Sequence, residues 1–155
     1  YVSLGVLLNI PDNNFRQLID YVKQMDKQAK PSGWTPDLLL WFMLNSRMKE
    51  QEKQKYAETL AYPRLYNGLY KVIQAPNAAA AKDALSKYLD RWYNLNSNAP
   101  WYNSHLKDNS YRGYWAWEVA AVAKIMHIDD SDLKNNQYYP YDMVHWEYNE
   151  TTAKE

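Results

Sequence analysis

The side chains that could carry chemistry gather between residues 111 and 142. Glu118 and Lys124 are the only charged residues in the segment 113–126, which is otherwise apolar and aromatic. A lone carboxylate in such surroundings costs free energy unless hydrogen-bond donors satisfy it. We therefore expect Glu118 either to accept hydrogen bonds that tie two helices together or to serve as the general base of a helical enzyme.

The histidines give the enzyme interpretation little support. His105 and His127 lie too far from Glu118 along the chain to form the HExxH pattern, which sets two imidazoles on one helical face around a metal. The sequence has no cysteine, no GxSxG nucleophile elbow, no P-loop and no dinucleotide-binding fingerprint. We therefore expect no catalysis, no metal and no cofactor.

Three aspartates, Asp129, Asp130 and Asp132, surround Ser131 just after this segment. An EF-hand loop that binds calcium needs a longer segment with a glycine at its sharp turn and a distant glutamate, and this stretch has no glycine. The pattern instead predicts that Asp130 or Ser131 caps a short helical turn, with Asp132 in the first turn, where a carboxylate suits the helix dipole.

Length and composition limit the class of protein. A chain of 155 residues suits one domain spanning residues 1–155, and 18 basic against 18 acidic side chains create no overall field that favours nucleic acid or a membrane. The longest apolar run, residues 38–44, is far shorter than the ~20 residues of a membrane span, and the start shows no secretion signal. With no cysteine, these features predict a cytoplasmic protein. Because the chain opens at Tyr1 inside an apolar segment, we expect an N-terminal portion to be missing.

Helical punctuation recurs along the chain, and no segment alternates for long enough to predict a strand. We expect an all-α single-domain bundle of about six or seven helices. The predicted helices begin at or just after Asp12, Thr35, Pro63, Asn77, Gly113 and Asp142. Apolar spacing predicts these buried faces: Phe15, Leu18, Ile19, Val22 and Met25; Leu65, Leu69 and Val72; Ala81, Leu85, Tyr88, Trp92 and Leu95. Residues 38–44 are apolar all round, which predicts an element at the centre of the bundle.

The predicted helix over residues 113–126 would carry two stripes. Small residues would form a groove that lets another helix approach closely: Gly113, Ala116, Ala120 and Ala123. The opposing stripe would hold the carboxylate among aromatic and branched side chains: Tyr111, Trp115, Glu118, Val122 and Ile125.

Three segments in the last third of the chain resemble the PoNi-type immunity proteins, which protect bacteria against PoNe-type toxin nucleases. They read GYWAWEVAAVAKI from Gly113, IDDSDL from Ile128 and YYPYDMVH from Tyr138. The segments KDALSKYLDRWYNLN at residues 82–96 and WYNSH at residues 101–105 occur in the same order. Residues that match the family pattern are Gly113, Tyr114, Trp115, Glu118, Asp129, Asp130, Tyr139, Pro140, Tyr141 and Asp142, while Trp117 replaces an expected phenylalanine.

The resemblance implies an all-helical cytoplasmic protein that binds and neutralises a cognate DNase toxin, typically one that a type VI secretion system delivers to rival bacteria. It implies no catalysis, no cofactor and no direct contact with nucleic acid or membrane. A motif shared by many immunity proteins serves the scaffold, since specificity for one toxin requires residues that differ. We therefore assign a structural role to the signature residues Gly113, Tyr114, Trp115, Glu118, Tyr139, Pro140 and Tyr141.

Charge and aromatic content suggest where a toxin would bind. Residues 129–155 hold seven acids against two lysines, a net charge of −5, and residues 1–128 carry the compensating +5. An acidic surface would attract the basic surface of a nuclease, although an acidic tail that is merely solvated fits the same count. With 15 Tyr and 7 Trp, the chain is also rich in side chains that suit interfaces. The predicted toxin-binding residues are Asp129, Asp130, Asp132, Asp142, Trp101 and Tyr102.

Two functions from other classes compete with immunity. A general adaptor or oligomerisation domain could form a homo-oligomer through the small-residue groove. A helical hydrolase that uses Glu118 as its base is the less favoured alternative.

Overall fold

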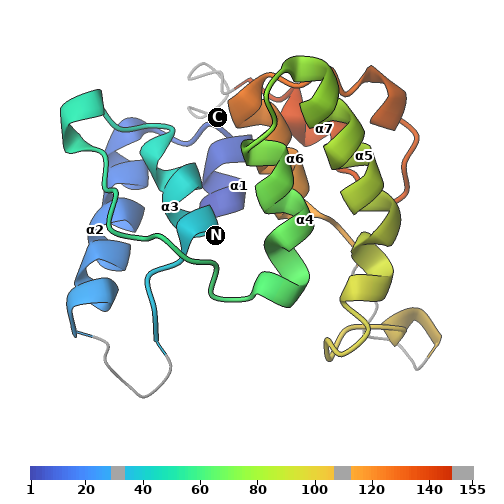
Figure 1. The fold of residues 1–155 in the computed structure, drawn as a ribbon, viewed down its shortest axis with the longest axis horizontal. Helices are drawn as coiled ribbons and strands as arrows, with labels where there is room; N and C mark the ends of the chain where they lie inside the picture. The colour runs from blue at the N-terminus through green and yellow to red at the C-terminus, as the bar shows by residue number, and fades with distance from the viewer. Residues whose placement is uncertain (29–33, 107–112, 148–155) are drawn as a thin grey trace, which may run out of the picture.

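The computed structural model describes residues 1–28, 34–106 and 113–147 of the chain. Within these ranges the chain forms seven α-helices, three 3-10 turns and no strand, which confirms the predicted all-α bundle (Figure 1). The helices are α1 (Val2–Leu7), α2 (Asp12–Gln28), α3 (Leu38–Asn45), α4 (Pro63–Ile73), α5 (Ala78–Leu95), α6 (Trp117–Met126) and α7 (Tyr141–Val144). The 3-10 turns are η1 (Glu50–Glu52), η2 (Ser104–Leu106) and η3 (Ser131–Leu133).

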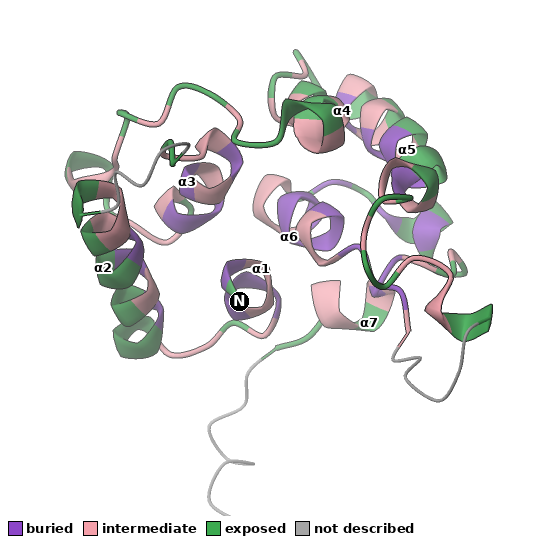
Figure 2. Ribbon diagram, turned by 90° about the horizontal axis from the view of Figure 1, so that it is seen from below, coloured by how far each residue is buried: buried purple, intermediate pink, exposed green. Residues whose placement is uncertain are grey.

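Helix α6 lies at the centre of the bundle, surrounded by α1, α3, α4, α5 and α7 (Figure 2). Its sequence is apolar on nearly all sides, which is the pattern expected of a helix covered from several directions. Ala116, Ala120 and Ala123 of the predicted small-residue groove are at most 1% exposed. Neighbouring elements of the same chain therefore cover this stripe, and it offers no surface for a homodimer.

The predicted buried faces agree with the structure. Phe15, Ile19 and Val22 of α2 are buried, as are Leu69 and Val72 of α4. On α5 the buried side chains are Ala81, Leu85, Tyr88, Leu89 and Trp92. The buried side chains of α3 are Leu39, Trp41, Met43 and Leu44, but this helix lies beside α1 and α6 and not at the predicted centre of the bundle. The remaining predicted core residues are half-buried: Leu18, Met25, Leu38, Leu40, Phe42, Leu65 and Leu95.

The predicted helix starts at Asp12, Pro63 and Asn77 are confirmed, and the predicted cap at Thr35 is wrong. Pro63 occupies the first turn of α4, and the Asn77 side chain accepts a hydrogen bond from the backbone N–H of Ala80 at 2.9 Å. The cap of α3 is Asp37 rather than Thr35, with Oδ1 accepting from the Leu40 N–H at 2.7 Å. The second oxygen of Asp37 accepts from the Ala61 N–H at 2.7 Å. This contact with a segment 24 residues away favours Asp37, and local spacing could not reveal it.

The predicted helix over residues 113–126 is wrong in its first turn, because α6 begins only at Trp117. Gly113 has a positive φ of 83°, a conformation that favours glycine and that a helix does not use. The Ala116 N–H donates to the Tyr138 carbonyl at 2.8 Å instead of joining a helical ladder. Trp115 therefore does not share a helix face with Glu118, and Tyr111 of the predicted stripe lies outside the described residues.

The prediction of a short helical turn is confirmed, because Asp130 is the N-cap residue of η3 and Asp132 lies in its first turn, but the expected side-chain cap is not formed. Neither Asp130 nor Ser131 caps the turn with its side chain. Instead Oδ1 of Asp129 accepts from the Ser131 N–H at 3.2 Å and from its hydroxyl at 2.7 Å. The last helix, α7, begins at Tyr141, one residue before the predicted start at Asp142.

Candidate partner-binding site

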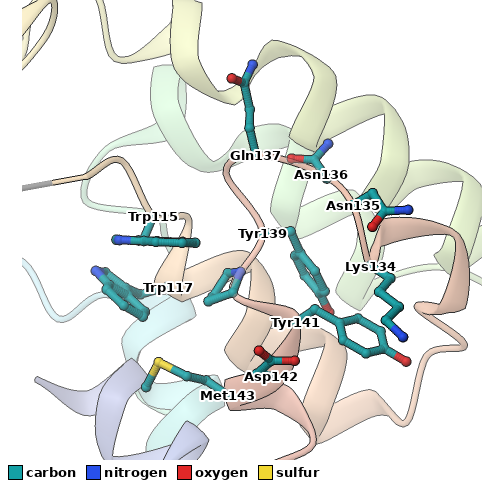
Figure 3. A pocket seen from close by; sticks show the side chains of 11 residues that line it. Trp115, Trp117, Lys134, Asn135, Asn136, Gln137, Tyr139, Tyr141, Asp142 and Met143 are labelled. Carbon is teal, nitrogen blue, oxygen red and sulfur yellow. The ribbon is translucent and has the colours of Figure 1, made fainter. Parts of the chain in front are cut away.

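Residues of the sequence signature meet around one open pocket of about 420 Å³, here called the signature pocket. It is lined by Trp115, Trp117 and residues 134–137 and 139–143. Figure 3 shows the two tryptophans on one side of it and Tyr141 with Lys134 on the other. The fold thus brings Trp115, Tyr139, Pro140, Tyr141 and Asp142 together from two segments more than twenty residues apart.

Backbone hydrogen bonds hold the two walls of the signature pocket in register. The Ala116 N–H donates to the Tyr138 carbonyl, so the chain between Trp115 and Trp117 lies against residues 138–139. Asn136 stabilises the turn on the opposite side of the pocket. Its Oδ1 accepts from the Tyr138 N–H at 2.9 Å, and its backbone carbonyl accepts from the Tyr139 N–H at 3.1 Å. The pocket is therefore built on bonded backbone rather than on side chains alone.

The walls of the signature pocket have the chemistry of a protein interface. Trp115 is 41% exposed, and its ring centroid lies 6.0 Å from that of Trp117. Across the pocket, the Lys134 ammonium lies 6.0 Å from the centroid of the Tyr141 ring. Asp142 is exposed beside them. Aromatic side chains surrounded by amides and charges are typical of surfaces that bind proteins.

Asp130 lies beneath this surface rather than on it. Its side chain is 4% exposed, with Oδ2 accepting from the Tyr139 hydroxyl at 2.8 Å and Oδ1 lying 3.0 Å from His145 Nε2. Burial, followed by the hydrogen bond to Asp130, raises the pKa of Tyr139 well above its usual range. Asp130 therefore ties η3 to the wall of the signature pocket and to α7, and it adds nothing to the exposed acidic surface.

Asp129 and Asp132 share one cation. Lys82 Nζ lies 2.7 Å from Asp129 Oδ2 and 2.8 Å from Asp132 Oδ2, and both acids are exposed. The hydrogen bond from Lys82 holds the pKa of Asp129 well below its usual range, and the two acids raise the pKa of Lys82. The acids remain accessible, but Lys82 offsets part of their charge.

Trp101 and Tyr102 belong to an aromatic cluster at the end of α5. Trp101 stacks on Trp92 with ring centroids 5.5 Å apart, and Tyr102 stacks on Tyr93 at 4.5 Å. Trp101 is 37% exposed and Tyr102 is half-buried, so each presents part of its ring at the surface. Tyr114 of the signature packs in the same cluster, with its ring centroid 5.1 Å from that of Tyr93.

Glu118 is the acceptor that ties α5 to α6, as the first of its two predicted roles requires. Its Oε1 accepts from the Trp92 indole N–H at 2.6 Å, and the residue lies in the first turn of α6. Burial raises the pKa of Glu118. Burial and then the charge of Glu118 raise the pKa of Tyr66 to about 12, and they raise that of Tyr88 further. In the described part of the chain, no group of three or more acidic or histidine side chains could hold a metal ion.

Sequence reasoning missed several residues of this region. Trp117 and residues 134–137 line the signature pocket. Trp117 lies within the first signature segment, and the run of amides is the sequence signal for residues 134–137. Lys124 is the one cation of the apolar segment 113–126. Its ammonium donates to the backbone carbonyl of Leu7 at 2.7 Å and to that of Trp146 at 2.9 Å. These carbonyls lie at the ends of remote elements, so no local pattern marks them.

The bundle and its site define an all-helical protein with a surface suited to binding another protein. None of the helices in the described ranges is long and apolar enough to span a membrane. A family model described as PoNe immunity proteins (PoNi), C-terminal, matches residues 35–143. The chain belongs to this family, whose members neutralise PoNe toxins and are not enzymes. Its partner is therefore a cognate toxin. Neither a curated protein nor a solved structure matches the chain.

Proposed function

We propose that this chain binds a PoNe toxin that degrades DNA and blocks it in the cytoplasm of the cell that makes both proteins. In this proposal a type VI secretion system delivers the free toxin to rival bacteria. The match to the PoNe immunity family over residues 35–143 carries the proposal. The signature pocket and the exposed acids beside it form the proposed contact surface.

Electrostatics favour Asp142 among the predicted acids. A nuclease must present basic side chains to the phosphates of DNA, so exposed carboxylates on the inhibitor accelerate its encounter with that surface. Lys82 offsets the charge of Asp129 and Asp132. Asp142 makes no ion pair with any residue in the described ranges, and it lines the signature pocket. We therefore rank Asp142 above Asp129 and Asp132 for direct attraction of the toxin.

Aromatic anchors support the same surface. Trp115 is partly exposed beside the signature pocket, and Trp101 is held by stacking on the buried Trp92. A ring that is already held in place loses little conformational entropy when a partner covers it. We therefore propose Trp115, Trp101 and Tyr102 as further, apolar contacts with the toxin.

Copurification and a DNA-degradation assay test the proposal. The chain is coexpressed with the PoNe toxin encoded beside its gene, and the purified mixture is assayed on plasmid DNA. A stable complex in which the toxin no longer cuts DNA is the expected result. A complex that still cuts DNA contradicts inhibition, and the absence of a complex contradicts direct binding.

Reversing the charge of Asp142 tests the contact surface. In Asp142→Lys, we expect the association rate with the toxin to fall about tenfold at low salt, with a smaller loss at high salt, because steering is screened. Stopped-flow or surface-plasmon measurements at two salt concentrations give this rate. The matched control is Asp20→Lys, which makes the same charge change on the exposed face of α2. Equal rates for both variants would remove Asp142 from the contact surface.

A further inference from the structure

A second cavity, of about 450 Å³, opens between α1, α3, α4 and α6. Its wall includes Ser3 and Leu4 of α1, Leu40 of α3, Tyr66 of α4 and Glu118 of α6, among others. Trp117 lines both this cavity and the signature pocket, so the two hollows share one wall. A partner that covers the signature pocket would therefore lie next to the second cavity.

The residues around this second cavity favour a cation. Two acids, Asp37 and Glu118, belong to its wall, and among the residues that the structure describes no lysine, arginine or histidine lines it. Five aromatic residues also line the cavity: Tyr1, Trp34, Tyr62, Tyr66 and Trp117. Carboxylates bind ammonium and guanidinium groups through charge-assisted hydrogen bonds, and aromatic ring faces attract the same groups.

The two acids of the cavity differ in how much acceptor capacity they have left. Asp37 uses one oxygen for the Leu40 N–H and the other for the Ala61 N–H. Glu118 accepts from the Trp92 indole through Oε1 and from its own backbone N–H. A carboxylate offers about four lone-pair sites. Glu118 therefore retains the capacity to accept from a further donor.

Desolvation of Glu118 makes pairing with a cation favourable. Burial raises its pKa, which means that the surroundings destabilise the charged form. A cation beside the carboxylate would compensate that loss, and the low-polarity wall would strengthen the attraction. An apolar ligand would leave the carboxylate uncompensated.

We propose that this cavity receives one lysine or arginine side chain of the toxin, whose cationic head pairs with Glu118 while the aromatic residues flank its alkyl stem. The partner's identity rests on the proposed function, since a nuclease presents basic side chains on the surface that binds DNA. Asp142 would then steer the toxin to the surface, and Glu118 would hold one of its basic side chains.

The substitution Glu118→Gln tests the pairing. Glutamine keeps the size of the side chain and an acceptor for the Trp92 indole, but it removes the charge. We expect the Kd for the toxin to rise at least about tenfold, chiefly through faster dissociation, because a desolvated charge pair is lost. Asp20→Asn is the control, since it removes one exposed acid from α2. Thermal unfolding of both variants establishes that they are folded.

The outcomes separate this inference from the proposed function. If the unsubstituted chain fails to bind the toxin, the proposed function fails. If the unsubstituted chain and Glu118→Gln bind with the same Kd, the inference alone is overturned. Tight binding that is lost in Glu118→Gln and retained in Asp20→Asn supports both.

A titration without toxin tests whether the cavity accepts a cation at all. The probe is N-acetyl-lysine methylamide, with N-acetyl-norleucine methylamide as its neutral counterpart, and the readout is the NMR signal of the Trp92 indole N–H. We expect a saturable shift with the lysine probe only, and none in Glu118→Gln. An identical response to both probes, or no response to the lysine probe, overturns the inference.

Discussion

Two carboxylates, Asp26 and Glu118, each accept a hydrogen bond from the indole of a buried tryptophan, but their surroundings differ. Asp26 accepts from Trp34 Nε1 at 3.2 Å, Trp41 Nε1 at 2.7 Å and the Tyr56 hydroxyl at 2.9 Å. These donors join α2 to α3 and to the segment that precedes α4. Glu118 accepts from one side chain of the described residues, Trp92, and faces the second cavity.

The difference concerns acceptor capacity rather than residue type. Three donors from three segments use most of the hydrogen-bond acceptor capacity of Asp26, so we assign this residue a structural role only. Glu118 satisfies one donor that the fold needs and keeps capacity for another. A carboxylate held in place by the scaffold, yet incompletely satisfied, is suited to recognise a partner without moving.

Removing the donor of Glu118 should give the largest effect on stability. Trp92 is 4% exposed, and its ring stacks on Trp101 and contacts Tyr138. We expect Trp92→Ala to lower the free energy of unfolding by about 3–5 kcal/mol, because a large core side chain and the donor to a partly buried carboxylate are both lost. Urea denaturation followed by circular dichroism measures this loss. A change below about 1 kcal/mol would contradict the central role assigned to this ring.

Replacing Asp26, the acceptor of the Trp41 indole, should lower the free energy of unfolding by less. Asp26→Ala leaves the indole N–H of Trp41, a residue 1% exposed, without its acceptor. We expect the free energy of unfolding to fall by about 1–3 kcal/mol, the cost of one unsatisfied buried donor. Affinity for the toxin, measured below the unfolding transition, should stay unchanged. A loss of affinity as large as that of Glu118→Gln would remove the contrast between the two acids.

The pH dependence of stability should sharpen the contrast further. Burial raises the pKa of Glu118 above its ordinary value of 4.5, with Tyr66 and Tyr88 nearby. The folded state therefore holds the Glu118 proton more tightly than the unfolded state does. The stabilisation that comes from this protonated carboxyl is fully present below pH 4.5 and is lost as pH rises through the pKa of the folded state. The unfolding free energy of the unsubstituted chain minus that of Glu118→Gln should fall with rising pH. A difference that stays flat or rises would show that burial does not raise this pKa.

Local patterns predicted much of the fold. Pro63 and Asn77 mark helix starts because a fixed φ and a capping side chain act within one turn. Two of the wrong predictions share another cause. The start of α6 depends on the bond from the Ala116 N–H to the Tyr138 carbonyl, and the cap at Asp37 is reinforced by its bond to the Ala61 N–H. Both bonds join residues more than twenty positions apart, beyond the reach of local spacing.

Of the six residues predicted to bind the toxin, only Asp142 lines the signature pocket. The other signature residues around it were predicted to be structural. Trp115, Tyr139, Pro140, Tyr141 and Asp142 were named from the sequence signature, and the fold gathers them around the signature pocket. Because Trp115 is far from the other four residues in the chain, only the tertiary structure shows that they lie around one pocket. The binding roles proposed for Asp142 and the aromatic residues stay predictions until the toxin complex is measured.

The sequence alone determined the helical class and the family, because apolar periodicity and capping chemistry act within a few residues and the signature is a linear pattern. Only the tertiary structure decided which acids are exposed. Asp130 and Asp142 stand twelve residues apart with the same carboxylate, yet one accepts from a tyrosine at 4% exposure and the other is exposed beside the signature pocket. Burial and hydrogen-bond partners come from elements remote in the chain, and they determine whether a carboxylate stabilises the fold or remains available for binding.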